Sequence, residues 1–412
     1  MKFCELTPEE YENHVNHHFS HYTQSVTHYN YKKNNNEPVY LVGVKEGEQV
    51  LAACLLTSAR ALKFFSYFYS HRGPVMDYTN AALVDLFYSE LTKYLKVRKG
   101  LFVLVDPHIL MNYRDHEGEL MQHFKVEDFI SHLTQLGYRH KGFTVGYSMD
   151  SQARWLSVLD IENKDEAQLL KAMDYQTRRN IKKTLEMGVK LRDLSIEETE
   201  TFYRLFKMAE DKHGFSFRKY DYFVRMQETY GDKCRLVLSY IDLDEYLDRL
   251  KNEQQQMQQE FAASSKELAE NPGFRKLKNK HNEQDKKLQV LAKKIKEIES
   301  LRASDGAILE LASALYIHNN HELYYLSSGS NPKYNQFMGP YNMMWQMIQY
   351  AQSLNLKKYN FYGVSGDFTE KSPDLGVVKF KKGFNAVVEE YIGDFEKPLR
   401  PLFYKIYKRM KR

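Results

Sequence analysis

Apolar side chains recur every seven residues on both sides of Pro272-Gly273, and this repeat is the strongest constraint on the fold. Side chains at the a and d positions of two segments joined by a tight turn share one buried stripe. Residues 243–303 therefore predict an antiparallel coiled-coil arm, in which each helix is roughly 40 Å long at about 1.5 Å per residue. The positions of the repeat are Leu243, Leu247, Leu250, Met257, Phe261 and Leu268 before the turn and Phe274, Leu277, His281, Leu288, Leu291, Ile295 and Ile298 after it.

Strand-like sequence flanks this arm, at residues 235–241 and 308–317. An antiparallel hairpin brings its two ends together, so we expect these two segments to lie side by side at the base of the arm. The arm is thus predicted to be an insertion into a globular domain.

The two helices of the arm differ in charge. In one interpretation the charges complement each other across the hairpin and solvate its outer faces. In the other, the basic helix contacts RNA phosphates. The acidic positions are Asp244, Glu245, Asp248, Glu253, Glu260, Glu267 and Glu270, and the basic ones are Arg275, Lys276, Lys278, Lys280, Lys286, Lys287, Lys293, Lys294 and Lys296.

The 412 residues are enough for two or three domains with ordinary cores, and the formal net charge of +5 permits a phosphate-bearing partner without requiring one. The amino terminus has no apolar signal region, and no segment approaches the roughly 20 apolar residues of a membrane span, so we expect a cytoplasmic protein. Cys4, Cys54 and Cys234 are odd in number and far apart. They predict reduced thiols, with neither a disulfide framework nor a zinc site.

Two stretches of the chain have the same order of predicted elements. Residues 39–44 and 50–56 form a β-hairpin, followed by a helix through 83–95 and a strand at 101–105; residues 308–317 and 323–326 repeat that order, with a helix through 344–354 and a strand at 359–362. The sequence therefore predicts an α+β protein with two units of similar plan. We place them at residues 1–150 and at 151–242 with 304–395, leaving a basic segment at 396–412.

Between the two units, residues 155–159 predict a strand and residues 164–187 a single helix that ends at Gly188. A second helix is predicted over residues 195–213. Ser195 and Glu198 form its capping box and Gly214 stops it.

The common catalytic motifs are absent. The sequence has no GxGxxG, GxxxxGK[ST], HExxH or GxSxG string and no metal-ligand spacing, which removes support for dinucleotide, P-loop, zinc-protease and serine-hydrolase chemistry. The two-unit pattern suggests acyl transfer, but the [RQ]xxGx[GA] pyrophosphate loop of acetyl-CoA users is missing as well. An acyl donor other than acyl-CoA is therefore needed.

Five strings in order, spread over nearly the whole chain, resemble the FemABX peptidyltransferases. YNQFMGPY, NFYGVSGDFTE and KFKKGFNA make the likeness closer to the FemA/FemB type than to FemX, and the lysine-rich hairpin stands where this family has one. The five strings are at residues 69–75, 136–143, 325–331, 360–366 and 376–384.

This resemblance implies two GNAT-like (acyl-CoA N-acyltransferase-like) subdomains that face one cleft, with the coiled-coil arm inserted in the second. It implies an aminoacyltransferase that moves glycine or serine from aminoacyl-tRNA to an amine of the lipid-linked peptidoglycan precursor, lipid II, without a metal or organic cofactor. Such an enzyme works in the cytoplasm at the inner face of the membrane, alone, as a homodimer or with a partner paralogue.

The family's Phe-Lys pair aligns with Phe380 and Lys381. The resemblance implies that Lys381 stabilises the charge on the ester carbonyl or binds the terminal tRNA phosphate, and that Phe380 forms a wall for the aminoacyl end. We expect Lys381 to lie at an exposed, loop-like site. Without the resemblance, the sequence favours the alternative, in which Phe380 is a core residue and Lys379, Lys381 and Lys382 form a solvated basic run.

The resemblance also assigns acceptor binding to Arg218 and Tyr222, whose spacing of four residues places both side chains on one face of a helix. A guanidinium suits bidentate phosphate contact, and the alternative is an ordinary exposed pair. Tyr325 is a further acceptor contact, although relatives have a second tyrosine where this chain has Ser327. An amino-terminal acceptor lysine corresponds to Lys32 or Lys33.

Two more basic features are candidates. Arg72 either binds a substrate phosphate or braces the turn that contains Pro74. A cluster on the helix before Gly188 either contacts tRNA or a lipid pyrophosphate or forms a solvated face. Its members are Arg178, Arg179, Lys182 and Lys183.

The carboxyl-terminal segment is also basic, at Lys405, Lys408, Arg409, Lys411 and Arg412. It either rests on an acidic membrane surface or ends as a solvated helix.

Two rival functions stay open. The first is a paralogue that inserts serine and protects the cell wall from a glycine-specific endopeptidase. The second, of another class, is a non-catalytic RNA-binding or scaffold protein that acts through its arm.

Overall fold

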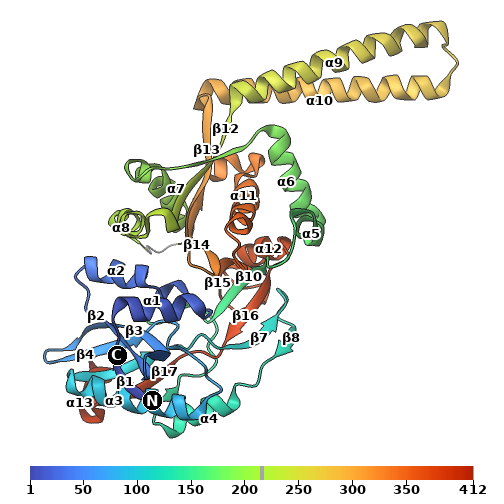
Figure 1. Cartoon of the computed structure of the whole chain (residues 1–412). Helices are drawn as coiled ribbons and strands as arrows, with labels where there is room; N and C mark the ends of the chain where they lie inside the picture. Colours follow the sequence, from blue (N-terminus) through green and yellow to red (C-terminus); the bar gives the residue numbers. More distant parts are fainter. Residues whose placement is uncertain (214–217, 412) are drawn as a thin grey trace.

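The computed structural model describes residues 1–213 and 218–411, in which two β-sheets each carry helices and a long helical hairpin projects from the second (Figure 1). The first sheet has the order β1 (Lys2–Glu5), β2 (Val39–Glu46), β3 (Gln49–Leu62), β4 (Phe65–Ser70), β6 (Gly100–Val105), β17 (Phe395–Pro398) and β9 (Arg139–His140), with β5 (Val75–Met76) paired to β3. The second has the order β11 (Lys190–Asp193), β12 (Cys234–Asp242), β13 (Ile308–His318), β14 (Glu322–Ser330), β15 (Lys358–Val364), β10 (Trp155–Asp160), β16 (Val387–Tyr391), β7 (Leu110–Arg114) and β8 (Leu120–His123).

The helices follow the same division. Those of the first unit are α1 (Pro8–His17), η1 (Tyr22–Gln24), α2 (Val26–Asn34), α3 (Ala81–Val97), α4 (Glu127–Gln135) and α13 (Pro401–Met410). Those of the second are α5 (Glu166–Ala172), α6 (Tyr175–Met187), η2 (Ile196–Glu198), α7 (Thr199–His213), α8 (Tyr220–Tyr230), η3 (Gly231–Lys233), α9 (Leu243–Glu270), α10 (Arg275–Asp305), η4 (Pro332–Phe337), α11 (Gly339–Ser353) and α12 (Leu375–Gly383).

The two sheets share one plan, which confirms the predicted α+β class. Strands β1-β2-β3-β4-β6 correspond to β11-β12-β13-β14-β15, and in each set the last pair is parallel while the others are antiparallel. A helix pair follows the first strand (α1 and α2, or α7 and α8), and α3 or α11 makes the crossover between the parallel strands. The predicted match of the hairpin β2–β3 with β13–β14 was wrong. The counterpart of β2–β3 is β12–β13, whose connection is the arm.

The central strand of each sheet's second half comes from a distant part of the chain or from the segment between the units. Strand β17 from the end of the chain lies between β6 and β9 of the first sheet, and β10 lies at the equivalent place between β15 and β16 of the second. In addition, β7 and β8 extend the second sheet beyond β16 although they precede residue 150. The strands therefore do not follow the predicted boundaries at residues 150 and 395.

The predicted helix over residues 164–187 is two helices. Asp165 caps α5, and the chain turns at Met173-Asp174, where the Asp174 carboxylate accepts the backbone N–H of Thr177 and starts α6. Gly188 ends α6 in the left-handed conformation, as predicted (φ 78°). The Ser195–Glu198 capping box is present, but on η2, which precedes α7. The predicted stop at Gly214 lies outside the described residues.

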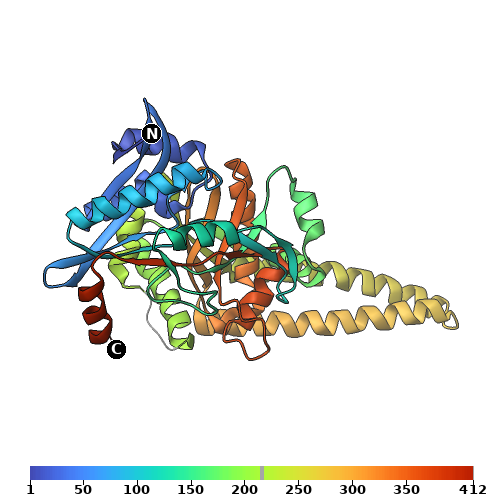
Figure 2. The ribbon, with the colours of Figure 1, turned by 90° about the horizontal axis from the view of Figure 1, so that it is seen from below.

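The arm consists of α9 and α10 packed antiparallel, and its base belongs to the body (Figure 2). Strands β12 and β13 pair from Cys234↔Ile317 to Asp242↔Ile308, so the flanking segments lie side by side as expected. At the base, arm residues such as Leu243 and Ile298 form one apolar cluster with Leu309 and Leu311 of the sheet. This cluster fixes the arm at its root.

Ion pairs join the two arm helices near the base: Asp244–Arg302 at 2.7 Å and Lys251–Glu299 at 2.8 Å. Farther out, Ser264 donates to Gln284 at 2.7 Å. Lys287 and Lys293 pair with glutamates of their own helix. The charges thus complement each other across the hairpin only close to the body.

The three cysteines are all in the described part of the chain and are free, as predicted. None of the helices in residues 1–213 and 218–411 is long and apolar enough to cross a membrane.

Candidate active site

A cavity of about 420 Å³ lies between the equivalent helix pairs of the two units. Helix α2 lies beside α8 (Figure 1). Residues of α2 and the preceding η1 line one side of the cavity, and α8 with the residues just before it lines the other. The lining residues are Tyr22, Thr23, His28, Tyr31, Lys32, Glu37, His71, Gln152, Arg218, Lys219, Tyr222, Arg225 and Met226. The site is thus built at the junction of the two units.

The cavity brings Arg218 and Tyr222 together, but not through a shared helical turn. Helix α8 begins at Tyr220, so Arg218 precedes it, and the predicted common helix face was wrong. The Arg218 guanidinium instead lies over the Tyr222 ring, 4.8 Å from its centroid. A cation stacked on a ring keeps its N–H groups free at the edge for an anion.

The structure distinguishes Lys32 from Lys33. Lys32 lines the cavity and forms an ion pair with Glu37 at 2.8 Å, whereas Lys33 lies over the ring of Tyr29 and is not among the lining residues. The lining holds the cations Lys32, Arg218, Lys219 and Arg225 against the single carboxylate of Glu37. Such a cavity favours an anionic ligand.

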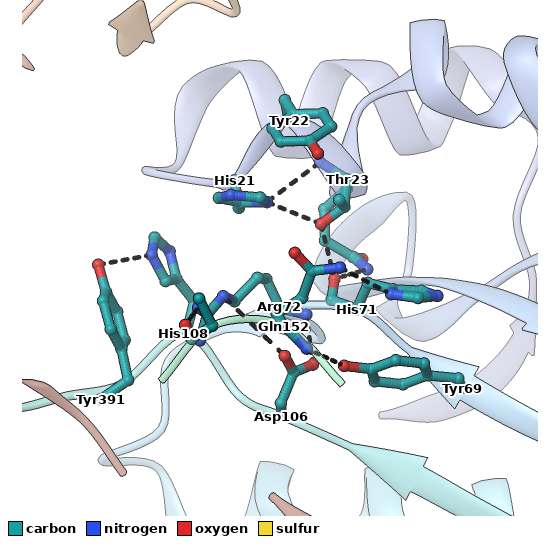
Figure 3. A network of polar contacts seen from close by, with 12 residues as sticks. His21, Tyr22, Thr23, Tyr69, His71, Arg72, Asp106, His108, Gln152 and Tyr391 are labelled. Atoms are coloured by element: carbon teal, nitrogen blue, oxygen red, sulfur yellow. Dashed lines mark hydrogen bonds and ion pairs between the residues drawn. The ribbon is translucent and has the colours of Figure 1, made fainter. Parts of the chain in front are cut away.

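The lining residues Thr23, His71 and Gln152 belong to a network of polar contacts (Figure 3). The Gln152 side-chain amide reaches Nδ1 of His71 at 3.3 Å, while its Oε1 accepts the Tyr362 hydroxyl at 2.9 Å. Because the amide N–H donates to Nδ1, the other ring nitrogen of His71 carries the proton and donates to Thr57 at 3.2 Å. Burial, with nearby Lys32 and Arg72, lowers the pKa of His71 to about 3. His71 is therefore a neutral wall residue at physiological pH.

Arg72 braces the junction and does not face the cavity. It is 2 % exposed, and its guanidinium donates to the carbonyl of Ala153 and stacks 4.6 Å from the centre of the Tyr391 ring. Its backbone N–H donates to Asp106 at 2.7 Å (Figure 3), and burial raises the pKa of Asp106 to about 7. These contacts favour the bracing role over phosphate binding, because the guanidinium spans residues of both units.

Lys381 is not at an exposed loop-like site, and that expectation was wrong. It lies on α12, is 4 % exposed, and its Nζ donates to the carbonyls of Gly363 at 2.7 Å and Tyr362 at 3.2 Å. Burial lowers its pKa to about 7, an effect that Asp374 partly opposes. The lysine thus holds the end of β15, where Tyr362 has a positive φ of 66°.

One residue separates Lys381 from the cavity. The Tyr362 carbonyl accepts from Lys381, while the Tyr362 hydroxyl donates to the lining residue Gln152 and lies 3.4 Å from that of Tyr22. Phe380 lies farther back, half-buried against the rings of Tyr341 and Phe384, at 5.1 and 5.2 Å. It contributes to the core of the second unit.

Tyr325 also lies apart from the cavity lining. Its hydroxyl donates to Ser328 and its ring packs 5.4 Å from that of Tyr316, and burial raises its pKa to about 12. The basic cluster of α6 faces solvent at Arg178, Arg179 and Lys182, and Lys183 is half-buried.

Comparison with known proteins identifies the relatives of this fold. The family model described as "FemAB family" matches residues 6–412. Aminoacyltransferase FemA of Staphylococcus epidermidis is 38 % identical over 100 % of this chain and 99 % of its own length, and that of Staphylococcus aureus is 36 % identical with the same coverage. The chain belongs to the FemAB family.

A solved structure has the same fold. The crystal structure of FemX superposes with a TM-score of 0.82 at 22 % identity and covers 98 % of this chain and 99 % of its own. A tandem GNAT protein from the clavulanic acid biosynthesis pathway aligns with a TM-score of 0.48. The whole chain therefore has the fold of FemX, and the FemA relatives make this FemAB protein a transferase.

Several cavity residues of this FemAB protein were not foreseen: Tyr31, Glu37, His71, Gln152 and Arg225. One signal was available for Arg225, because it follows Tyr222 by three residues on the same helix, α8. His71 and Gln152 gave none, since they meet only when the segment after β9 crosses to the second sheet. Within the described residues, no three His, Cys, Asp or Glu side chains are grouped to hold a metal ion.

Proposed function

We propose that this protein transfers glycine or serine from aminoacyl-tRNA to the amine of a lipid-linked peptidoglycan precursor, in the cytoplasm at the inner face of the membrane. One observation carries the proposal: a cationic, aromatic-walled cavity stands at the junction of two acyltransferase-like units. The FemA relatives, named aminoacyltransferases, support the class of reaction.

The acceptor occupies the cavity in this proposal. Lys32 lines the α2 side of the cavity and Arg218 the α8 side, and both cations suit the phosphates of the precursor. The Tyr222 ring gives a flat surface for the peptide of the precursor. Glu37 holds Lys32 in place until a phosphate competes for it. Lys219 and Arg225 add to the positive field that attracts the anion.

The chemistry needs no covalent intermediate. The acceptor amine, once it has lost a proton, attacks the ester carbonyl; the new C–N bond forms, the ester C–O bond breaks, and the tRNA hydroxyl leaves with a proton. An ester is already activated, so the protein has to position the amine and stabilise the negative charge on the carbonyl oxygen.

Lys381 is the proposed cation for that oxygen, or for the terminal phosphate of the tRNA. An ammonium has three N–H donors and Lys381 uses two of them on the carbonyls of Tyr362 and Gly363, which leaves one for a ligand. Its pKa of about 7 allows the charged form near neutral pH. We propose that the aminoacyl end of the tRNA enters along the side of α12 that carries Phe380. We propose Tyr325, on β14, as a further contact for the acceptor.

The exposed face of α6 is the proposed contact for tRNA or headgroup phosphates. Three of its four cations are solvent-exposed, which leaves them accessible to a large polyanion. This contact is secondary to the cavity, since it bears on affinity and not on the reacting atoms.

The test is a transfer assay with a mixture of charged tRNAs and lipid II of defined bridge length, read by mass spectrometry. The expected product is lipid II heavier by one or more glycyl or seryl residues. The mass increase identifies which amino acid was transferred. A product that forms equally well from uncharged tRNA with free amino acid would overturn the proposal, as would no product from any charged tRNA.

A further inference from the structure

Helix α13 at the end of the chain presents apolar side chains to solvent. One side of the helix is fixed to the first unit, where Tyr404 and Tyr407 pack on Phe102 with ring centroids 5.3 and 5.5 Å apart. On another side, residues at i, i+4 and i+8 form an open stripe: Leu402 is 76 % exposed, Ile406 50 % and Met410 73 %. A stripe of this kind is normally buried in a globular protein.

A second element extends this stripe. Phe403 of α13 is half-exposed and contacts Phe65 of β4, with ring centroids 4.9 Å apart. Phe65 follows the β3–β4 turn, where Phe64 is 70 % exposed. Figure 2 shows α13 projecting beside that turn, at one end of the molecule. The apolar surface therefore includes two separate elements.

The surroundings of the stripe are cationic. Helix α13 has no acidic residue, and its last turn is basic. Lys408 pairs with Glu396 at 3.4 Å and Lys411 with Asp150 at 3.8 Å, but in the described part of the chain Lys405 and Arg409 pair with no carboxylate. Lys63 is exposed next to Phe64, with its Nζ 5.5 Å from the ring centroid.

We propose that this surface, the α13 face, rests on an anionic lipid membrane. We define it by its apolar residues Phe64, Leu402, Phe403, Ile406 and Met410 and its cations Lys63, Lys405 and Arg409. An apolar stripe beside lysine and arginine is the composition of helices that lie in a bilayer interface, with the apolar side in the acyl boundary and the cations among the headgroups.

The charge pattern distinguishes a membrane from a second copy of the chain. A symmetric dimer through this face would place Lys405 and Arg409 near their own copies, since the face contains no carboxylate to meet them. In contrast, the phosphates of anionic lipid headgroups can pair with Lys405 and Arg409 at the same time. The α13 face does not overlap the cavity, so the inference is independent of the proposed reaction.

The test is co-sedimentation of the full-length protein with vesicles that contain no substrate. We expect binding to vesicles of phosphatidylcholine mixed with phosphatidylglycerol and much weaker binding to phosphatidylcholine alone. Lys405→Gln with Arg409→Gln should weaken partitioning about twenty-five-fold, because each cation near an anionic surface contributes about a factor of five. Leu402→Gln with Ile406→Gln should weaken it by a similar or larger factor.

Val290→Gln is the matched control, because Val290 is 69 % exposed on a helix of the arm, far from the α13 face. It should bind as the unaltered protein does. All substituted residues are exposed, so unchanged melting temperatures show that the variants fold. The inference would be overturned if the wild-type protein did not bind anionic vesicles. It would also be overturned if Val290→Gln weakened vesicle binding as much as the substitutions in the α13 face. A dimer in solution that becomes monomeric on Leu402→Gln with Ile406→Gln would assign the face to a second copy instead.

Discussion

The two units of this protein share their strand order and helix placement, yet differ at one connection. In the first unit Gly47-Glu48 joins β2 to β3 directly after the pair Glu46↔Gln49. In the second, the whole arm joins β12 to β13 directly after the pair Asp242↔Ile308. In both units the two strands stay paired up to the connection. The fold therefore depends on the strand register, and the connection tolerates a long insertion.

A second difference concerns the helix that follows β6 or β15. Helix α4 in the first unit has no lysine, whereas α12 at the equivalent place in the second has Lys381 buried against the end of β15. The units are therefore alike in scaffold and differ in this buried lysine, and the following experiments test what the difference does.

The largest expected effect is that of Lys381→Ala. If the cation acts on the carbonyl oxygen, transfer should fall on the order of a hundredfold or more, as when an oxyanion donor is removed. The measurement is single-turnover transfer with charged tRNA and lipid II. Lys382→Ala is the matched control, since Lys382 is exposed on the same helix and pairs with Glu117. Near wild-type transfer by the Lys381 variant would reject the role.

Arg218→Ala tests the acceptor wall. Loss of a charge-assisted contact with a phosphate should raise the KM for the lipid acceptor roughly ten- to a hundredfold, with a smaller change in kcat, because the contact is present in ground and transition states alike. Steady-state kinetics with varied acceptor measure both. Arg192→Ala, an exposed arginine that pairs with Glu198 away from the cavity, should leave KM unchanged. A loss confined to kcat would contradict acceptor binding.

Shortening the arm tests whether the insertion is needed for chemistry. Removal of residues 257–270 and 275–288 takes two heptads from each helix, keeps the turn and keeps every buried residue of the apolar cluster at the base, with Met257 the one partly buried neighbour lost. The KM for charged tRNA should rise less than about tenfold while kcat stays near its original value. Complete loss of activity in a variant with an unchanged melting temperature would favour the scaffold alternative.

The smallest effect concerns pH. The folded-state pKa of Lys381, about 7, lies below its usual value of 10.5 because burial disfavours the ammonium. Between these values the unfolded chain binds more protons, so wild-type stability should rise with pH from about 7 to 10, by at most about 1.4 kcal/mol per pH unit, relative to Lys381→Met. Denaturant titrations of both proteins at several pH values measure this difference. A stability difference between the two proteins that is constant with pH would show that folding does not lower the pKa of Lys381.

Local patterns predicted much of this fold. The heptads gave the arm with its turn, the period-two runs gave β2, β3, β12 and β13, and the Ser195–Glu198 box gave the start of a helical segment. The break between α5 and α6 was missed although Asp174 is a favourable N-cap, because apolar periodicity continues across it. Strands β7 and β8 were missed because they are short and lie at an edge of the other sheet.

The sequence by itself determined the arm and the two α+β units, since each depends on residues close together in the chain. Only the tertiary structure decided that β17 joins the first sheet and that β7 and β8 join the second, that Lys32 and not Lys33 reaches the cavity, and that Lys381 is buried. The physical reason is that desolvation and long-range strand pairing depend on neighbours far away in the sequence, and local periodicity contains no information about them.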